Sequence, residues 1–246
     1  GGPQAQAYTR ALTGDVNGLR LGLVEEGFGI AGQSERDVDE AVTQAAHGYE
    51  KLGALVNRVS IPWHTDGPHI FNGIIVEGMT MLMVAGNSMG TNWKGHYNIG
   101  LLDTFARNRR DRADDLSDTT KRAVMLGQYM QDRYNGRYYA KAQNLARTLK
   151  AAYDDALQRF DLLVMPTLPF KATRIPAPDA SREENVTRAL EMNANTAPFN
   201  VTGHPAITVP CAMSEGLPVG MMLVGRTGED ATVLRAADAF QRSIAS

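Results

Sequence analysis

The 246-residue sequence has one cysteine, Cys211, and almost no excess of charge of either sign. A single thiol excludes a disulfide framework, so we expect a reducing, cytoplasmic environment. The formal net charge of −2 gives no field that would attract nucleic acid or an anionic membrane surface. The sequence also lacks a run of 18 apolar residues, and we expect no membrane span. These absences predict a soluble, intracellular globular protein.

Motifs for metals and cofactors are missing as well. The histidines do not occur four residues apart on any expected helix and no Cys-x-x-Cys accompanies them, so we expect no zinc site. No G-x-G-x-x-G follows a strand and no Walker-type loop occurs, so we expect no nucleotide or other cofactor. Cys211 has no cationic neighbour in the sequence and is expected to be a buried thiol rather than a nucleophile. The histidines are His47, His64, His69, His96 and His204.

One pattern typical of a catalytic serine is present in residues 86–90, GNSMG. The G-x-S-x-G nucleophile elbow requires a strand before the turn and a helix directly after it, and the following residues offer no helix start. A triad of Ser88, Asp161 or Asp179, and His204 would have the chain order of an α/β-hydrolase. A loop histidine satisfied by backbone groups is the more ordinary role for His204. We therefore do not favour this type of hydrolase.

The first quarter of the chain predicts a βαβ unit. Residues 19–24 form an apolar strand, and Ser34 is expected to cap a helical pattern that Gly53 ends. A second strand follows at residues 54–61, so the two strands should be parallel with a right-handed crossover. Between them, Glu25-Glu26 would lie either at the carboxyl edge of the sheet, where sites collect, or in a solvated turn.

The remaining chain alternates helices with short strands. Near the end of the helical pattern of residues 64–85 lie three closely spaced methionines, Met79, Met81 and Met83. Their flexible side chains suit either a core or an irregular pocket wall. Arginines in residues 107–112 are expected on a solvated helix face. Helices are predicted over residues 64–85, 117–129, 138–159, 183–194 and from Asp230 onward. In the last of these helices, one apolar face contains Val233, Ala237, Phe240 and Ile244. A strand is predicted over residues 161–165.

The stretch Thr202–Gly225, TGHPAITVPCAMSEGLPVGMMLVG, contains two apolar strands separated by a turn. A continuous apolar run of this kind predicts a strand at the centre of a sheet, covered on both faces. Together with the βαβ unit, it predicts an α/β fold with a mixed, mostly parallel sheet sandwiched between helices. No internal repeat or linker divides the sequence.

This stretch resembles the C-terminal core of the amidase signature family, in which G-x-P-A-I-x-V-P is followed by G-L-P-V-G and an apolar strand. The resemblance covers nearly the whole chain but only about the second half of the family's pattern. We therefore expect residues 1–246 to form a single C-terminal portion whose N-terminal catalytic half is absent. Further matching segments are Leu19–Gly27, the helices that contain Lys121–Gly127 and Tyr138–Ala142, the strand Asp161–Thr167 and the turn Asn195–Asn200.

The resemblance implies an amide hydrolase that uses a Ser–cis-Ser–Lys triad, in which a neutral lysine acts as the base. This sequence has no Ser-Ser pair and no lysine that matches the catalytic one, so it carries no catalytic residue. The implied substrate is a small carboxamide, and the full-length protein is expected to be a homodimer without nucleic-acid or membrane partners. The alternatives are an A-type subunit of a glutamyl- or aspartyl-tRNA amidotransferase, and a non-catalytic binding or structural module.

By position in the family pattern, Phe71, Asn193 and Thr196 are the candidate substrate-binding residues, although core or surface roles remain open for Phe71 and Asn193. Most of the family has a Gln in the strand after G-L-P-V-G, where this sequence has Met221-Met222. That departure resembles the enantioselective amidases associated with nitrile breakdown. We further expect these residues to fold poorly alone, because strands from the middle of a sheet would become edges.

Overall fold

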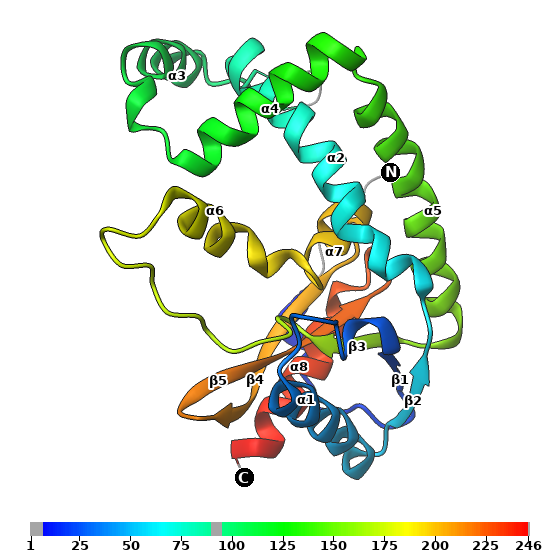
Figure 1. Cartoon of the computed structure of the whole chain (residues 1–246). Coiled ribbons are helices and arrows are strands. Elements are labelled where there is room, and N and C mark those ends of the chain that lie inside the picture. The colour runs from blue at the N-terminus through cyan, green and yellow to red at the C-terminus, as the bar shows by residue number, and fades with distance from the viewer. Residues whose placement is uncertain (1–6, 90–94, 246) are drawn as a thin grey trace. The chain divides into compact units, whose positions relative to one another are not determined.

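The computed structural model of the protein describes residues 7–89 and 95–245 (Figure 1). The chain forms two compact units, each described here by itself. Unit 1 comprises Gly1–Pro68, Ala146–Ile175 and Met192–Ser246, and contains the sheet. Unit 2 comprises His69–Leu145 and Pro176–Glu191 and is helical where the structure describes regular elements.

The sheet of unit 1 has five strands in the order β2-β1-β3-β5-β4. β1 (Arg20–Val24) pairs in parallel with β2 (Leu55–Val59) and with β3 (Leu162–Pro166). β5 (Leu217–Gly225) runs antiparallel to β3 and to β4 (Ala206–Ser214), so β4 has the direction of the first three strands. Four strands therefore share one direction, and the predicted mixed, mostly parallel sheet is confirmed.

The predicted βαβ unit is present, with α1 (Arg36–Gly48) between β1 and β2. The helix continues as the short helix η3 (Tyr49–Leu52) and ends at Gly53, whose φ of 89° favours glycine. The predicted cap was wrong. The residue before α1 is Glu35, which makes no side-chain capping bond, while the Ser34 hydroxyl accepts from the Ile30 amide and closes the preceding turn.

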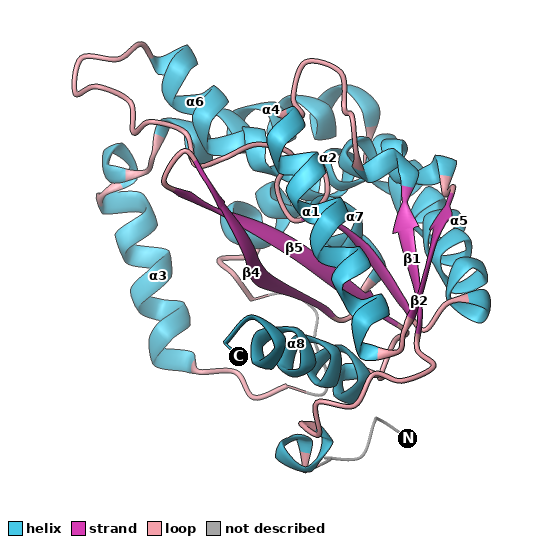
Figure 2. Cartoon of the chain, turned by 90° about the horizontal axis from the view of Figure 1, so that it is seen from below, coloured by secondary structure: helices cyan, strands magenta, loops and turns pink. Residues whose placement is uncertain are grey.

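Helices cover both faces of the sheet (Figure 2). Alternating strand residues on one face form a core with α1 and with α8 (Asp230–Ala245), and this core includes Leu21, Val164 and Met221. Their strand neighbours, such as Leu163 and Met222, are also buried and therefore face the opposite side. The short helix α7 (Ala197–Thr202) and the part of α5 (Arg137–Arg159) that belongs to unit 1 supply further buried residues: Leu149, Tyr153, Leu157 and Phe199.

The prediction of two central strands in Thr202–Gly225 was half wrong. β5 lies inside the sheet and is mostly buried, but β4 is an edge strand with alternating exposure, and Met213 is 67% exposed. Pro210 lacks an amide donor, and the register shifts between Pro210 and Ala212. A proline and a bulge are devices that native edge strands use, and they explain the position of β4. On α8, Ile244 is also exposed rather than packed.

Unit 2 is built mainly from helices that approach closely at glycines. α2 (Gly67–Met79) enters it at His69 and continues as a π-helix, η5 (Thr80–Ala85). A Cβ on Gly127 would lie 2.0 Å from the Thr80 hydroxyl and 2.4 Å from the Val76 carbonyl oxygen, so only glycine permits this contact. The other helices are α3 (Ile99–Asp111), α4 (Asp118–Tyr134), α5 up to Leu145 and α6 (Arg182–Leu190).

The predicted start of α4 is confirmed, since the Ser117 side chain accepts from the Thr120 amide. Asn135 follows the helix in the left-handed region with φ 53°. The arginines of residues 107–112 lie at the end of α3, as the charge pattern predicted. The remaining short helices are η1 (Tyr8–Ala11), η2 (Glu25–Gly27), η4 (Pro62–Asp66), η6 (Ala113–Asp115) and η7 (Glu191–Asn193).

One helical run among the described residues, Pro62–Ala85, is long and apolar enough to cross a membrane by length and composition alone. Within unit 2, however, Glu77 and Thr80 of this run are buried. The Glu77 carboxylate accepts from the Tyr139 amide in the first turn of α5. The Glu77 carboxylate thus lies at the N-terminus of α5, where a negative charge is favourable.

Candidate functional site

The carboxyl ends of the parallel strands β1 and β3 are joined by one buried amide, that of Asn195. Its Nδ2 donates to the Gly27 carbonyl oxygen at 3.0 Å and to the Pro166 carbonyl oxygen at 2.7 Å. Asn195 is fully buried. Because carboxyl edges of parallel strands are where binding sites collect in α/β proteins, the segment around Asn195 is the candidate site of unit 1.

The third hydrogen bond of Asn195 fixes the protonation state of His64. Since Asn195 Nδ2 donates twice, Oδ1 is an acceptor, and His64 Nε2 at 3.0 Å must carry the proton. His64 Nδ1 then accepts from the Tyr153 hydroxyl at 2.6 Å. Burial lowers the pKa of His64 and raises the pKa of Tyr153, which favours these neutral forms. The cluster of Asn195, His64 and Tyr153 therefore holds the edge in place and offers no free base.

Glu26 connects the carboxyl ends of β1 and β2. Its carboxylate accepts from the Ser60 hydroxyl at 2.5 Å and from the Ile61 amide at 2.7 Å. Of the two roles that the sequence left open, the structure supports a position at the carboxyl edge. Both carboxylate oxygens are nevertheless engaged in bracing the chain after β2, so the role is structural.

Two of the three residues predicted to bind substrate lie beside Asn195. Asn193 ends η7 and is half-buried, and Thr196 donates from its hydroxyl to the Met192 carbonyl oxygen at 2.8 Å. The anchored amide of Asn195 thus fixes Asn193 and Thr196 at the edge of the sheet. Phe71 is half-buried in α2 and belongs to unit 2, whereas Asn193 and Thr196 belong to unit 1.

Two candidates for the alternative triad with Ser88, namely His204 and Asp161, are engaged with other side chains. His204 uses Nδ1 with the Thr202 hydroxyl at 2.8 Å and Nε2 with the Asp154 carboxylate at 3.2 Å, so side chains rather than backbone groups satisfy it. Asp161 binds Arg20 at 2.9 Å and Arg226 at 3.1 Å. The hydrogen bond from Arg20 lowers the pKa of Asp161 far below its ordinary value. Gly90 of the motif lies outside the described residues.

Among the described lysines and arginines that form ion pairs in unit 1, Lys171 is the most enclosed, with a side chain 10% exposed. It contacts the Glu35 carboxylate at 2.6 Å, the Asp37 carboxylate, and the Glu215 carboxylate at 3.6 Å. Hydrogen bonds to Asp37 and Glu35 raise the pKa of Lys171. A catalytic lysine base must be neutral, so this lysine cannot take that role.

Cys211 is half-buried rather than buried as predicted, and burial raises the pKa of its thiol to about 11, so it lacks the low pKa of a nucleophilic cysteine. No group of three or more histidine, cysteine, aspartate or glutamate side chains in the described parts of the chain has the geometry for a metal ion. The chemistry of this edge is thus binding and positioning. In the part of the chain that the structure describes, Asn195, His64 and Glu26 brace this edge.

The sequence missed Asn195, His64 and Tyr153 as a cluster. Asn195 was noted only within a matching turn, and His64 only as a histidine without a metal partner. The signal was weak because the three residues lie in separate segments that meet only in the folded chain.

Comparison with known proteins agrees with this architecture. The chain matches the family model "Amidase" over residues 3–234 and belongs to the amidase signature family. It is 43% identical over 238 residues to the enantioselective amidase of Rhodococcus rhodochrous, covering 96% of this chain and 46% of that protein. It is 33% identical over 241 residues to a glutamyl-tRNA(Gln) amidotransferase subunit of Methanosarcina mazei, covering 96% of this chain and 48% of that protein.

Among solved structures, a bacterial aryl acylamidase of the amidase signature family superposes with a TM-score of 0.70 at 22% identity. The match covers 98% of this chain and 46% of the other, and it supports the fold. The chain therefore spans about half the length of these relatives.

Proposed function

We propose that this chain forms the substrate-pocket wall and part of the scaffold of an amide hydrolase that converts a small carboxamide and water to a carboxylate and ammonia. The serine nucleophile, the relay serine and the lysine base lie outside these 246 residues, in a preceding half. On its own, the chain is inactive. The preferred class is the enantioselective amidase associated with nitrile breakdown.

The observation that carries this proposal is the 43% identity to the enantioselective amidase over 96% of the chain. The engaged state of Lys171, His64 and His204 supports the assignment of catalysis to residues elsewhere. Met221 and Met222, which stand where most of the family has a Gln, support the nitrile-associated class.

The lower identity of 33% makes an amidotransferase subunit the second candidate. Such a protein would pass ammonia to a partner that acts on a charged tRNA. We propose instead that the full-length protein is a cytoplasmic homodimer without nucleic-acid partners. Light scattering after gel filtration measures the mass of this assembly.

The decisive experiment uses the full gene product. Ammonia release from benzamide or propionamide, lost when the upstream serine nucleophile is replaced by alanine, is the expected result. A gene that encodes no upstream Gly/Ser-rich stretch with paired serines, or ammonia transfer only to charged tRNA, would overturn the proposal.

The acyl preference is tested at Asn193. We expect Asn193→Ile to shift the ratio of kcat/KM for benzamide over propionamide by about tenfold, because an apolar side chain replaces an amide in the pocket wall. Asn200→Ile, at an exposed position of α7, is the matched control and should leave the ratio unchanged. Equal ratios of kcat/KM in the two variants would show that Asn193 does not line the pocket.

A further inference from the structure

Unit 2 contains a pocket of about 290 Å³ between η5, α3 and α4. Its wall is mostly apolar and includes Met83, Val84, Phe105, Leu116 and Val124. The volume is at the low end of the range for small-molecule sites, which is about 300 to 1,000 Å³. Of the two roles left open for the methionines, Met83 therefore takes that of a pocket wall.

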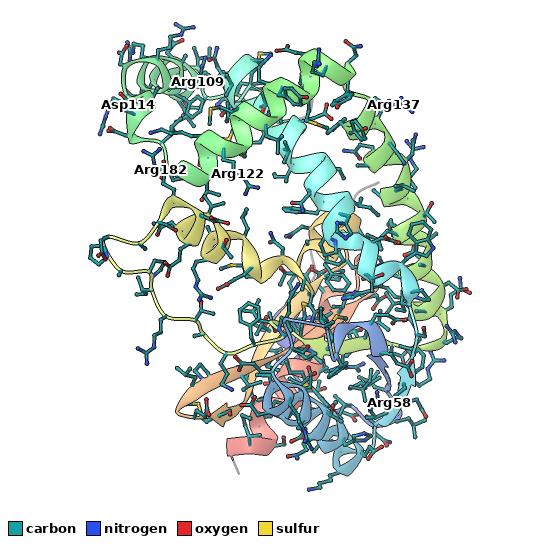
Figure 3. All side chains as sticks on the ribbon, in the orientation of Figure 1. Arg58, Arg109, Asp114, Arg122, Arg137 and Arg182 are labelled. Carbon is teal, nitrogen blue, oxygen red and sulfur yellow. The ribbon has the colours of Figure 1, made fainter. Side chains whose placement is uncertain are left out.

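Arg109, whose side chain Figure 3 labels on α3, lines this apolar pocket and brings a positive charge to it. Its Nη2 donates to the Asn87 side-chain oxygen at 2.7 Å, and its buried Nε has no hydrogen-bond partner among the described residues. No ion pair of Arg109 is found in the described ranges, and residues 90–94, GTNWK, contain no carboxylate. By contrast, the neighbouring Arg112 is paired with Asp115 at 2.6 Å.

The partner of Arg109 is held by an unusual backbone. Asn87 and Ser88 follow the π-helix with φ angles of 48° and 61°, in the left-handed region that non-glycine residues rarely adopt. Asparagine tolerates this conformation better than most residues. Both a π-helix and strained backbone concentrate at functional sites. The turn thus fixes the Asn87 oxygen that orients the guanidinium.

We infer that this pocket binds a small monocarboxylate with an apolar tail. The guanidinium recognises carboxylate oxygens through charge-assisted hydrogen bonds. Apolar walls suit a hydrocarbon tail and disfavour strongly hydrated anions such as phosphate. The inference does not rest on the proposed function, because no turnover is involved.

The test is calorimetric titration of the full gene product with benzoate and with benzamide, its neutral counterpart. Benzamide is titrated into the protein whose upstream serine nucleophile is replaced by alanine, so that it binds without being hydrolysed. We expect Arg109→Gln to weaken benzoate binding about tenfold or more and to leave benzamide binding unchanged. Arg109→Lys keeps the charge without the planar fork and should fall between wild type and Arg109→Gln. Val84→Trp, which fills the pocket, should also weaken benzoate binding.

Arg110→Gln is the matched control, because Arg110 is exposed on the same helix and does not line the pocket. Melting temperature and circular dichroism establish that each variant is folded. The inference is overturned if folded wild type does not bind benzoate, if Arg109→Gln binds it as wild type does, or if benzamide binding falls by the same factor.

Discussion

The two units bury their apolar residues very differently. Among the described residues, nearly all fully buried apolar side chains lie in unit 1, and only Ile70 and Ala142 lie in unit 2. Most of the exposed large apolar side chains are in unit 2: Ile75, Met81, Leu82, Met89, Tyr97, Ile99, Leu101, Met125, Leu126, Tyr129, Tyr134, Tyr138 and Leu190.

The difference teaches how each unit is held together. In unit 1 a sheet covered on both faces supplies a core, and buried polar groups such as Asn195 and His64 are paired across distant segments. Unit 2 depends on a few close helix contacts, such as that of Gly127 with α2. We expect local stability to follow burial, with unit 1 the more stable.

The largest expected effect is in unit 1, at Asn195. Asn195→Ala removes the partner of two backbone carbonyls and of His64, and it should lower the free energy of unfolding by about 3 kcal/mol or more. Urea unfolding followed by circular dichroism measures it. Asn200→Ala, exposed on α7, should change stability by less than about 0.5 kcal/mol. Similar values for both variants would show that the buried cluster does not hold the edge.

Gly127→Ala tests the close approach in unit 2. The added Cβ collides with the Val76 carbonyl, so the helices must separate at a cost of about 2 kcal/mol. Gly100→Ala is the control, since its nearest contact is 3.6 Å away and alanine favours helix by about 1 kcal/mol. Hydrogen exchange of α2 and α4 reports the effect locally. If Gly127→Ala leaves exchange unchanged, the contact contributes nothing to unit 2.

A smaller effect is expected where the two helices on one face of the sheet meet. The buried Tyr49 hydroxyl donates to the Ala236 carbonyl oxygen at 2.9 Å. Tyr49→Phe removes this bond and should cost about 1 kcal/mol in urea unfolding. Tyr8→Phe, at an exposed tyrosine, should cost nothing measurable. A cost below about 0.3 kcal/mol for Tyr49→Phe would indicate that water satisfies the carbonyl equally well.

The smallest effect is expected for the pH dependence of stability when Lys171 is replaced. Its carboxylate partners are largely exposed, so solvent screens their interaction with the lysine. The hydrogen bond from Lys171 lowers the pKa of Asp37 to about 2. The stability from Asp37 is therefore present above its unfolded pKa of about 4 and is lost as pH falls from about 4 to about 2. Lys171→Met should reduce the change in melting temperature with pH over this window, whereas Lys51→Met should not. Parallel profiles for wild type and Lys171→Met would contradict this assignment.

Local patterns predicted the fold well where the determinants are close in sequence. Ser117 caps α4, Gly53 ends the first helical segment, and the βαβ unit has the expected parallel strands. Local patterns failed to predict the position of β4 in the sheet, because an apolar run is compatible with either a central or an edge strand. Pro210, which favours an edge strand, was given too little weight.

The candidate site was less accessible to sequence reasoning. Asn193 and Thr196 were placed by family pattern, and their contact with substrate stays a prediction. The bracing role of Asn195 needs Gly27, His64 and Pro166, which come from three other segments. The same holds for Lys171, whose carboxylates lie before and within α1 and in the β4–β5 turn.

By itself, the sequence determined the alternation of helices and strands, the family, and the lack of a Ser-Ser pair, since these depend on residues near one another in the chain. Only the tertiary structure decided which strand is an edge, which polar groups are buried, and which cations are compensated. Burial and ion pairing depend on what surrounds a side chain in space, and most of those neighbours are distant in the sequence.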